Sequence, residues 1–392
     1  WRSLASNSLT LILVVLVFAA GILAWGRQQF TGPGPLEQAV CVRVDKGATL
    51  AAVSRQLETQ GAISDARIFR IGADYADRAA ELKFGSYLVS AGASMAEILA
   101  VLTEGGQSSC GREVNFRIGV TGADIVLREL DPTTNAFVEV VKFDPTAEQA
   151  PVEYKAALDD TDMRWRVTLA EGVTSWQVVD SLKRAAFLSG EIKEIPPEGS
   201  LSPDSYEVTK GEDRNVLIAE MQAQQAQILA DLWAARAEGL PYKTPEEALV
   251  MASIVEKETG VAEERPRVAS VFLNRLRDGM RLQTDPTVIY GITKGQGSLG
   301  RGLRQSELRR STPYNTYVID GLPPTPIANP GTESIKAALN PETTDYLYFV
   351  ADGSGGHVFA ATLAEHNANV TKWRAIEAQQ QEQQDQQQTT QP

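Results

Sequence analysis

The chain has 392 residues, of which 43% are hydrophobic and 22% are charged, the proportions of an ordinary globular protein long enough for two or three domains. Its formal net charge of −13 argues against a nucleic-acid partner, because binding a phosphate backbone requires a basic face. A largely uncharged polymer suits this charge balance better.

An uncharged apolar run lies near the start of the chain. Residues 9–25 read LTLILVVLVFAAGILAW and are flanked by Arg2 and Arg27, a length at the lower end of what spans a bilayer. We expect an uncleaved transmembrane helix here, with a cytoplasmic stub at 1–8 and the large C-terminal part on the periplasmic side of the inner membrane. A cleaved signal peptide is the alternative, but no clear small-residue cleavage site follows the run. Because the chain begins with Trp1, we expect at least an initiator methionine before it.

After a turn-rich linker at 26–40, one sequence pattern occurs twice. Residues 44–49 (VDKGAT) recur as 169–174 (LAEGVT), each followed by apolar residues at helical spacing. Each copy predicts a strand, a glycine turn, a threonine cap and an amphipathic helix. A second match pairs FGSY at 84–87 with PDSY at 203–206.

The two copies predict two related small α/β units built from strand, helix, helix and strand, at 41–113 and 167–211. This arrangement resembles the LysM type of carbohydrate-binding module. From the pattern alone, contact with a glycan and a simple spacer role are equally open. Between the units, residues 114–166 are acidic and strand-rich, and we assign them no function.

Cys41 and Cys110 are the only cysteines. A disulfide between them is left open, because it requires both an oxidising compartment and a fold that brings them together. Neither cysteine has a histidine nearby, and His357 and His366 are not at a metal-ligand spacing. We therefore expect no metal site and no cofactor.

The distal segment 212–376 is expected to be a mixed α/β catalytic domain, so the overall fold class is α+β. It opens with a long helix from Asp213 that a glycine, Gly239, is expected to end. Residues 244–247 (TPEE) then form a strong helix start, with a threonine cap and a proline in the first turn. The tail at 377–392 is almost all glutamine, and we expect it to be disordered.

The helix that begins after Thr244 carries two glutamates near its end. At about 100° per residue, Glu258 falls in the middle of the apolar face, whereas Glu256 lies toward its edge. A carboxylate on an apolar face costs free energy unless it is paired or kept protonated for use as an acid. A salt bridge to Arg265 or Arg267 is equally open on this pattern.

Amide and aromatic side chains follow this helix, and such groups suit sugar binding because rings pack on pyranose faces and amides bind hydroxyls. The candidate substrate-binding residues are Asn274, Gln283, Asp285, Tyr290, Tyr314, Asn315, Tyr317 and His357. Tyr317 could equally be a half-buried strand residue. His357 follows two glycines and is expected on a loop beside the cleft, where it positions a loop or a sugar.

Residues 251–367 resemble the endolytic murein transglycosylases, also called MltG or YceG-like proteins. The resemblance is carried by ASIVEKET at 252–259, NRL at 274–276, LQTDPT at 282–287, YNTY at 314–317, GLPP at 321–324, PG at 330–331, YLYFV at 346–350, GHVF at 356–359 and HN at 366–367. It departs from the family pattern at PDSY, where the usual aromatic before the proline is missing, and at the apparent insertion 114–166. The resemblance implies that the second glutamate of Glu-Lys-Glu-Thr, Glu258, is the catalytic residue.

The resemblance also implies a reaction. Lytic transglycosylases cleave the bond between N-acetylmuramic acid and N-acetylglucosamine without water, and the muramic acid 6-hydroxyl closes onto its own C1 to leave a 1,6-anhydro end. One carboxyl group then serves as acid and as base. Cleavage of nascent strands would end their elongation close to peptidoglycan synthases, which we expect as partners beside the glycan strands and the membrane.

Two alternatives remain. A hydrolytic muramidase would use Asp285 as a second carboxylate, although Asp285 before a proline is more simply expected to organise its own turn. A non-catalytic, membrane-anchored scaffold that binds peptidoglycan is the alternative from another class of protein.

Overall fold

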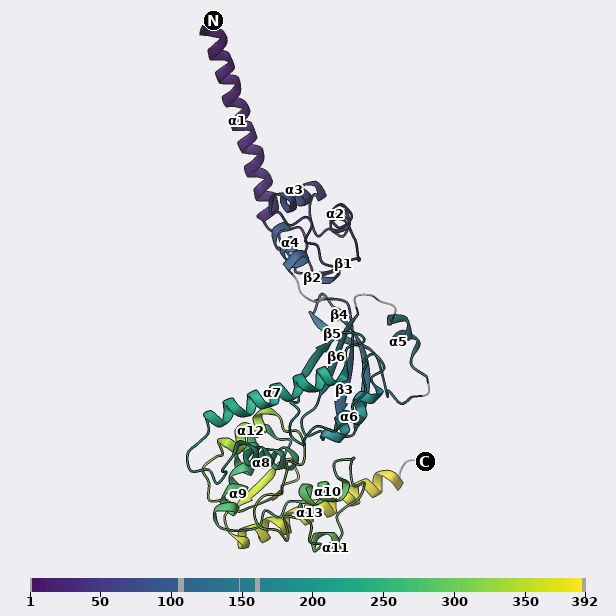
Figure 1. Ribbon diagram of the computed structural model, residues 1–392, viewed down its shortest axis with the longest axis vertical. Coiled ribbons are helices and arrows are strands. Elements are labelled where there is room, and N and C mark those ends of the chain that lie inside the picture. The colour runs from purple at the N-terminus through teal and green to yellow at the C-terminus, as the bar shows by residue number, and fades with distance from the viewer. Residues whose placement is uncertain (1, 105–108, 148, 159–162, 390–392) are drawn as a thin grey trace. The chain divides into compact units, whose positions relative to one another are not determined.

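A computed structural model describes residues 2–104, 109–147, 149–158 and 163–389 (Figure 1). Helices and strands both occur, so the chain is mixed α/β, as the sequence predicts. It divides into two compact units. Unit 1 contains residues 1–115, 125–143 and 147–165, and unit 2 contains residues 116–124, 144–146 and 166–392.

Unit 1 begins with a long apolar helix and a small α/β body. Its elements are α1 (Arg2–Thr31), β1 (Val40–Val44), α2 (Leu50–Thr59), α3 (Ala66–Tyr75), β2 (Gly85–Val89) and α4 (Met95–Glu104). Within α1, Leu11–Thr31 is long and apolar enough to cross a membrane. β1 and β2 pair antiparallel with Val42 opposite Tyr87, and both side chains are buried in the core of this body. The predicted order of strand, helix, helix and strand is therefore present in the first copy.

The segment predicted as a linker at 26–40 is docked on this body. Helix α1 runs on to Thr31, and the Gly34 amide donates to the Gly92 carbonyl at 3.0 Å. A Cβ at Gly34 would lie 2.1 Å from the Ala93 carbonyl oxygen, so only glycine permits this approach. The part of this segment from Gly34 onward is therefore fixed to the domain that follows.

Cys41 and Cys110 form a disulfide, which settles the pairing that the sequence left open. Their Cα atoms are 5.8 Å apart, within the usual range for a disulfide. The bond joins β1 to the segment after α4, and the Cys110 amide also donates to the Ser86 carbonyl at 3.0 Å. Both ends of the body formed by β1 to α4 are thereby tied together.

A five-stranded sheet has the strand order β5-β4-β3-β6-β7. Its strands are β3 (Arg112–Gly119), β4 (Gly122–Asp131), β5 (Ala136–Phe143), β6 (Arg164–Leu169) and β7 (Ser205–Val208), and α5 (Val152–Ala157) follows β5. The predicted strand-rich segment 114–166 thus supplies most of this sheet. β4 and β5 pair antiparallel, with a register shift between Leu127 and Arg128.

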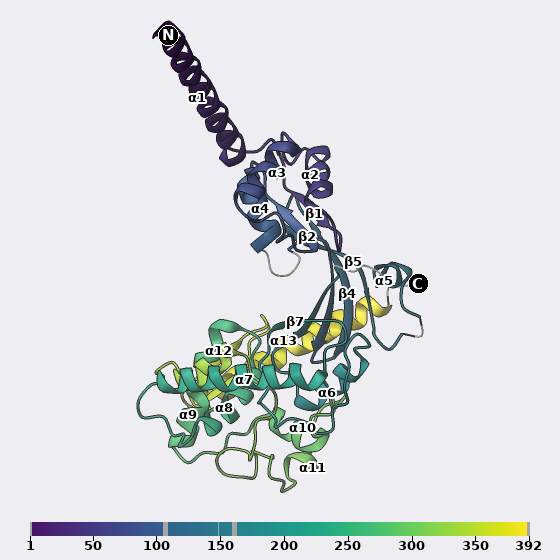
Figure 2. The same cartoon turned by 45° about the horizontal axis from the view of Figure 1, so that its top comes forward.

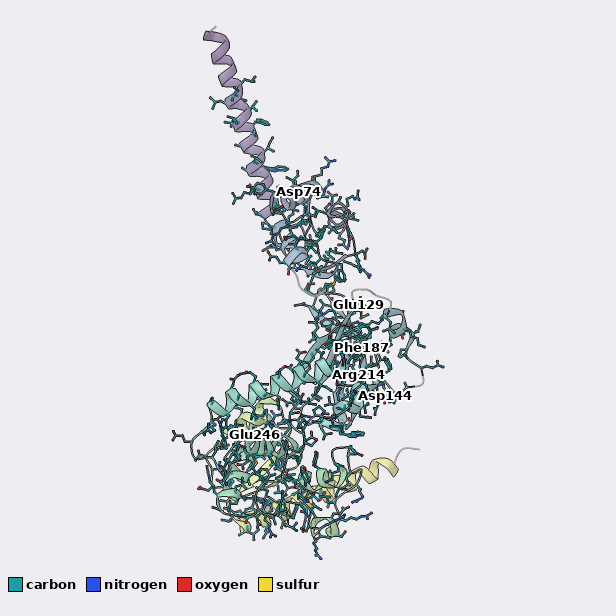
Figure 3. All side chains as sticks on the ribbon, in the orientation of Figure 1. Asp74, Glu129, Asp144, Phe187, Arg214 and Glu246 are labelled. Atoms are coloured by element: carbon teal, nitrogen blue, oxygen red, sulfur yellow. A yellow bond between two sulfur atoms is a disulfide. The ribbon has the colours of Figure 1, made fainter. Side chains whose placement is uncertain are left out.

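The second copy of the repeat lacks the second helix that we predicted. β6 is followed by α6 (Ser175–Arg184), but residues 185–204 contain no helix before β7. Three prolines in this stretch, Pro196, Pro197 and Pro203, explain the difference because proline removes a backbone donor and blocks a helix interior. Arg214, labelled in Figure 3, holds the stretch in place, since its guanidinium donates to the carbonyls of Leu182, Ala185 and Gly190.

The rest of unit 2 is mostly helical. Its elements are α7 (Arg214–Ala234), α8 (Pro245–Glu258), the 3₁₀ helix η1 (Ala262–Glu264), α9 (Arg265–Arg277), α10 (Asp285–Thr293), α11 (Gln305–Leu308), α12 (Thr332–Leu339), β8 (Tyr348–Ala351), β9 (His357–Ala360) and α13 (Leu363–Thr389). Helix α8 lies among α7, α9 and α12 (Figures 1 and 2). All residues from Ala248 to Val255 are buried, so α8 is a central helix rather than the two-faced helix that we predicted.

Two other predictions require correction. Helix α7 ends at Ala234, five residues before the expected stop at Gly239, which instead lies in the following loop with a φ of +70°. Helix α13 continues through the glutamine-rich tail to Thr389, where we expected disorder. Glutamine and glutamate favour the helix intrinsically, and a helical backbone satisfies its own hydrogen bonds without a core.

Candidate active site

Glu258 is the last residue of α8. Thr244 caps the start of this helix by accepting a hydrogen bond from the Glu247 amide, and Thr259 ends it in an extended conformation. The Glu258 side chain is half-buried. Burial raises its pKa above the ordinary glutamate value, and the hydrogen bond from the Thr284 hydroxyl partly offsets this effect. A carboxyl group with a raised pKa can hold a proton near neutral pH and donate it to a leaving group.

Arg265 and Arg267, which the sequence left open as ion-pair partners of Glu258, bind other carboxylates. Arg265 lies 3.3 Å from Glu171, and Arg267 lies 3.0 Å from Glu342. Across the described part of the chain, no ion pair reaches Glu258 within 4.0 Å. The carboxyl group of Glu258 is thus available for chemistry.

Glu256, the other glutamate of the motif, is held by neighbouring residues of the fold. Its carboxylate accepts a hydrogen bond from the Gly331 amide at 3.0 Å, at the start of α12, and it lies 4.0 Å from Arg265. The helix-face argument does not separate the two glutamates, since residues 248–255 of α8 are buried on all sides. Their partners now provide the physical distinction.

A cluster of threonines positions the hydroxyl that binds Glu258. The Thr284 amide donates to the Thr316 hydroxyl at 3.0 Å, and the Thr287 hydroxyl donates to the Thr284 carbonyl at 2.8 Å. Thr287 and Thr316 are fully buried, and their hydroxyl groups are 2.9 Å apart. This packing leaves Thr284 little freedom beside the carboxyl group.

Gln283 immediately precedes this threonine. It has a φ of +51°, a strained value for a residue other than glycine, and its side chain is exposed. Its backbone N–H donates to the Thr316 carbonyl at 3.1 Å. Gln283 therefore presents an exposed side-chain amide from the same turn that holds the partner of Glu258.

Asp285 and Tyr317 form a second pair close to Glu258. The Tyr317 hydroxyl donates to Asp285 at 2.7 Å. The pKa of Tyr317 is raised mainly by burial and secondly by this hydrogen bond. The charge of Asp285 raises the pKa of Glu258. Asp285 is the first residue of α10, but its carboxylate binds Tyr317 rather than the backbone of its own turn, contrary to our expectation.

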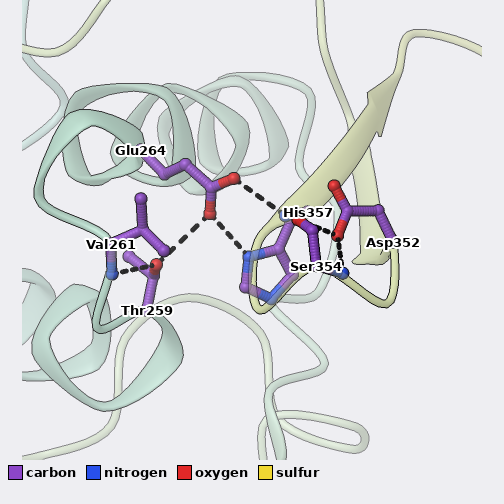
Figure 4. Close-up of polar contacts among 6 residues, drawn as sticks. All are labelled: Thr259, Val261, Glu264, Asp352, Ser354 and His357. Atoms are coloured by element: carbon purple, nitrogen blue, oxygen red, sulfur yellow. Dashed lines mark hydrogen bonds and ion pairs between the residues drawn. The ribbon is translucent and has the colours of Figure 1, made fainter.

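His357 and Glu264 form a third pair, shown in Figure 4. Glu264 accepts hydrogen bonds from the His357 amide and the His357 Nδ1, both at 2.8 Å, and from the Thr259 hydroxyl at 3.3 Å. Burial alone would raise the pKa of Glu264, but the contacts with His357 outweigh it and hold the pKa below the ordinary value. With Nδ1 bound, Nε2 is the ring nitrogen left for a ligand.

The His357 pair is linked to Glu258 in two ways. Thr259 follows Glu258 in the chain and bonds Glu264, and the electrostatic interaction with His357 lowers the pKa of Glu258. His357 is the first residue of β9, directly after the loop 352–356, in which Asp352 accepts hydrogen bonds from Ser354 (Figure 4). We expected His357 on a loop, whereas it begins this strand.

The profile of the YceG-like family matches residues 42–372. The chain belongs to the YceG-like family. It is 47% identical over 125 residues to the endolytic murein transglycosylase of Bacillus subtilis (strain 168), covering 32% of this chain and 34% of that protein. It is 29% identical over 342 residues to the endolytic murein transglycosylase of Streptococcus pneumoniae serotype 2 (strain D39 / NCTC 7466), covering 85% of this chain and 58% of that protein.

The chain thus spans about a third and somewhat more than half of the lengths of these two relatives. A crystal structure of a yceG-like protein from Listeria monocytogenes aligns with 85% of this chain and 99% of that chain, at 26% identity and a TM-score of 0.44. The profile match over residues 42–372 confirms the family that the sequence motifs indicated.

Two predicted sugar-binding amides of this YceG-like protein are used inside the fold. Asn274 donates to the carbonyls of Thr344 and Tyr346, at 2.8 and 3.0 Å. Asn315 is fully buried, and its amide donates to three backbone carbonyls within 3.1 Å. Neither side-chain amide has a donor hydrogen left for a sugar, so a sugar could be bound only through the side-chain oxygen.

Tyr290 and Tyr314 pack against each other with ring centroids 5.1 Å apart. The Tyr290 hydroxyl donates to Glu198 at 3.1 Å, and the Tyr314 hydroxyl lies 2.8 Å from that of Thr325. Their hydroxyl groups are therefore bound by other parts of the YceG-like fold.

Sequence reasoning missed Thr284, Glu264 and Arg275. Arg275 is only 8% exposed and donates to the carbonyls of Leu282 and Leu347, both at 2.6 Å. Its charge lowers the pKa of Glu258. Thr284 and Arg275 lie inside the quoted LQTDPT and NRL motifs, so the family signal included them without distinguishing their roles.

Proposed function

We propose that this YceG-like protein is an endolytic lytic transglycosylase that cleaves the bond between N-acetylmuramic acid and N-acetylglucosamine in nascent peptidoglycan strands. The relatives named endolytic murein transglycosylase support this assignment. The observation that carries it is the environment of Glu258, a half-buried carboxyl group with a raised pKa and one hydroxyl donor. Such a group suits a proton donor rather than a structural ion pair.

In the proposed reaction Glu258 acts twice. Its proton passes to the glycosidic oxygen as the bond from that oxygen to the muramic acid C1 breaks. The muramic acid 6-hydroxyl oxygen then bonds to C1, and its proton passes to the Glu258 carboxylate. The products are a 1,6-anhydro end and a strand that ends in N-acetylglucosamine. No water is consumed, so no second carboxylate is required.

The surrounding residues would hold the sugar and the carboxyl group. Thr284 orients Glu258 through its hydroxyl. Gln283 presents an exposed amide, and Asp285 and Tyr317 present a polar pair close to Glu258. We infer that Gln283, the Asp285 pair and His357 contact the substrate, and that Glu264 is a positioning residue for His357.

The location is also a proposal. Helix α1 would span the inner membrane and place the rest of the chain on its periplasmic side, near peptidoglycan synthases. The disulfide between Cys41 and Cys110 supports this side, because disulfides persist in oxidising compartments. The first repeat unit would contact the glycan as a LysM-like module. The second repeat belongs to the same compact unit as α8.

A hydrolytic muramidase is kept as a second candidate because Asp285 is near enough to raise the pKa of Glu258. Digestion of purified glycan strands in H₂¹⁸O separates the two reactions. The proposal predicts products that end in 1,6-anhydro-muramic acid and carry no ¹⁸O, as measured by mass spectrometry. Reducing ends that carry ¹⁸O would support hydrolysis, and absence of any product would favour the non-catalytic scaffold.

A further inference from the structure

Helix α3 of unit 1 has an exposed apolar surface. Ile71 is 68% exposed and Tyr75 is 94% exposed. The two residues are four apart and therefore neighbours on one face of the helix. The opposite face, with Ala66, Phe69 and Ala73, is buried in the body of unit 1. Two large apolar side chains thus lie side by side in solvent on one face of α3.

This helix lies against the end of the apolar helix α1. The Phe30 ring is seated on Gly72 of α3, where an added Cβ would lie 2.2 Å from the ring. Phe30 also packs on the core of the body formed by β1 to α4. Figures 1 and 2 both place α3 beside the last turns of α1, with β1 and β2 farther away. The orientation of α3 is thus tied to that of α1.

The spacing along α1 gives the depth of α3. The uncharged apolar run ends at Trp25, and Arg27 follows it. Phe30 is five residues beyond Trp25, which is about 7.5 Å along a helix. The headgroup layer on each side of a bilayer is roughly 5–8 Å thick. A helix in contact with Phe30 therefore lies at the level of the headgroups if α1 spans the membrane.

We propose that the face of α3 around Ile71 and Tyr75 rests in the headgroup layer of the membrane that α1 crosses. The inference depends on the proposed membrane anchoring. Tyrosine suits this layer because its ring is apolar and its hydroxyl is polar. Arg67 and Asp74 are also exposed on α3 and carry opposite charges, so the contact needs no anionic lipid. The body formed by β1 to α4 is then held against the bilayer and does not rotate freely relative to α1.

The test uses the full chain in nanodiscs of phosphatidylcholine, with a nitroxide label on one introduced cysteine. The positions are Ile71→Cys, Tyr75→Cys, Val15→Cys within α1, and Lys46→Cys in the exposed turn after β1. Collision with a water-soluble nickel chelate is measured by electron paramagnetic resonance. We expect the labels at positions 71 and 75 to collide with nickel several-fold less than the label at position 46.

The label at position 15 separates the two possible failures. If it is protected while positions 71 and 75 match position 46, α1 spans the membrane and the proposed surface contact is wrong. If position 15 is also open to nickel, the anchoring itself fails and the surface contact fails with it. All four positions are exposed in the protein alone, so the substitutions do not disturb a core.

Discussion

The Thr284 hydroxyl donates a hydrogen bond to the Glu258 carboxylate. This bond opposes the effect of burial, because it lowers the pKa of Glu258 whereas desolvation raises it. A carboxyl group that must both donate and accept a proton benefits from such a balance. The neighbouring buried threonines, Thr287 and Thr316, hold Thr284 in place.

Thr284→Val is expected to shift the pH dependence of cleavage. Without the hydroxyl, the pKa of Glu258 rises further. Because the protonated form of Glu258 acts as the acid, activity falls as pH rises through this pKa, and that decline should move to higher pH. The measurement is kcat/KM for strand cleavage across a pH series. A decline that stays in place or moves to lower pH would contradict the assigned role of the hydroxyl.

Thr287→Val is the matched control for this substitution. It removes a hydroxyl from the same threonine cluster but one that binds the Thr284 carbonyl rather than Glu258. The Thr284 carbonyl still accepts from the Thr316 hydroxyl at 3.3 Å, so we expect a stability loss of only about 1 kcal/mol. The shift of the pH profile should be smaller than that of Thr284→Val, because the hydroxyl that binds Glu258 is kept.

Glu264→Gln is expected to reduce the dependence of stability on acidic pH. The folded protein holds the pKa of Glu264 below its ordinary value. Its stabilising contribution is therefore full above the ordinary glutamate pKa of about 4.3 and is lost as pH falls through the lower folded value. Thermal midpoints measured from neutral to acidic pH should decrease less steeply in the variant than in the parent.

The same variant tests the positioning of His357. We expect kcat to fall roughly tenfold, because the ring loses a charged partner at Nδ1. Glu264→Asp should restore part of the loss. Equal activity of the parent and Glu264→Gln would show that the pair serves stability alone.

Asn329→Ala is expected to destabilise unit 2 strongly. Asn329 is fully buried, donates to the Val173 carbonyl at 2.9 Å, and accepts from the Leu201 amide at 3.0 Å. Removing it leaves buried groups unpaired, at about 2–4 kcal/mol in total, or roughly 5–15 °C in thermal midpoint. Calorimetry measures the change. Asn340→Ala, at an exposed helix end, is the control and should leave the midpoint nearly unchanged.

Replacing both Cys41 and Cys110 with serine is expected to destabilise unit 1. The disulfide closes a sequence separation of 69 residues, and its loss should cost about 4 kcal/mol in the chain-entropy description. Limited proteolysis should then cut the body formed by β1 to α4 first. If this region resists protease as well as the parent does, the disulfide is not a major source of its stability.

The sequence identified local features well and tertiary partners poorly. The α8 start at Thr244 and Pro245 was predictable because a capping threonine and a first-turn proline act within one turn of helix. The second repeat lacks its second helix because of its prolines, whose effect is visible in the sequence itself. The burial of α8 on all sides was not predictable, because it depends on α7, α9 and α12, which come from other parts of the chain.

The site shows the same division. Glu258 emerged from a motif, but its partner Thr284 lies 26 residues away and nothing in helix periodicity links them. Amides such as Asn274 and Asn315 look alike in sequence whether they bind a sugar or a buried carbonyl. Only the folded chain shows which donors are already used.

The most direct test of the central claim compares two neighbouring glutamates of one motif. Glu258→Gln and Glu256→Gln are each made in the full chain, and the release of 1,6-anhydro ends from purified glycan strands is measured by mass spectrometry. We predict that Glu258→Gln lowers the rate by roughly 10²-fold or more, while binding to strands is retained. Glu256→Gln keeps an acceptor for the Gly331 amide and should stay within about tenfold of the parent. Unchanged anhydro product from Glu258→Gln would contradict the account.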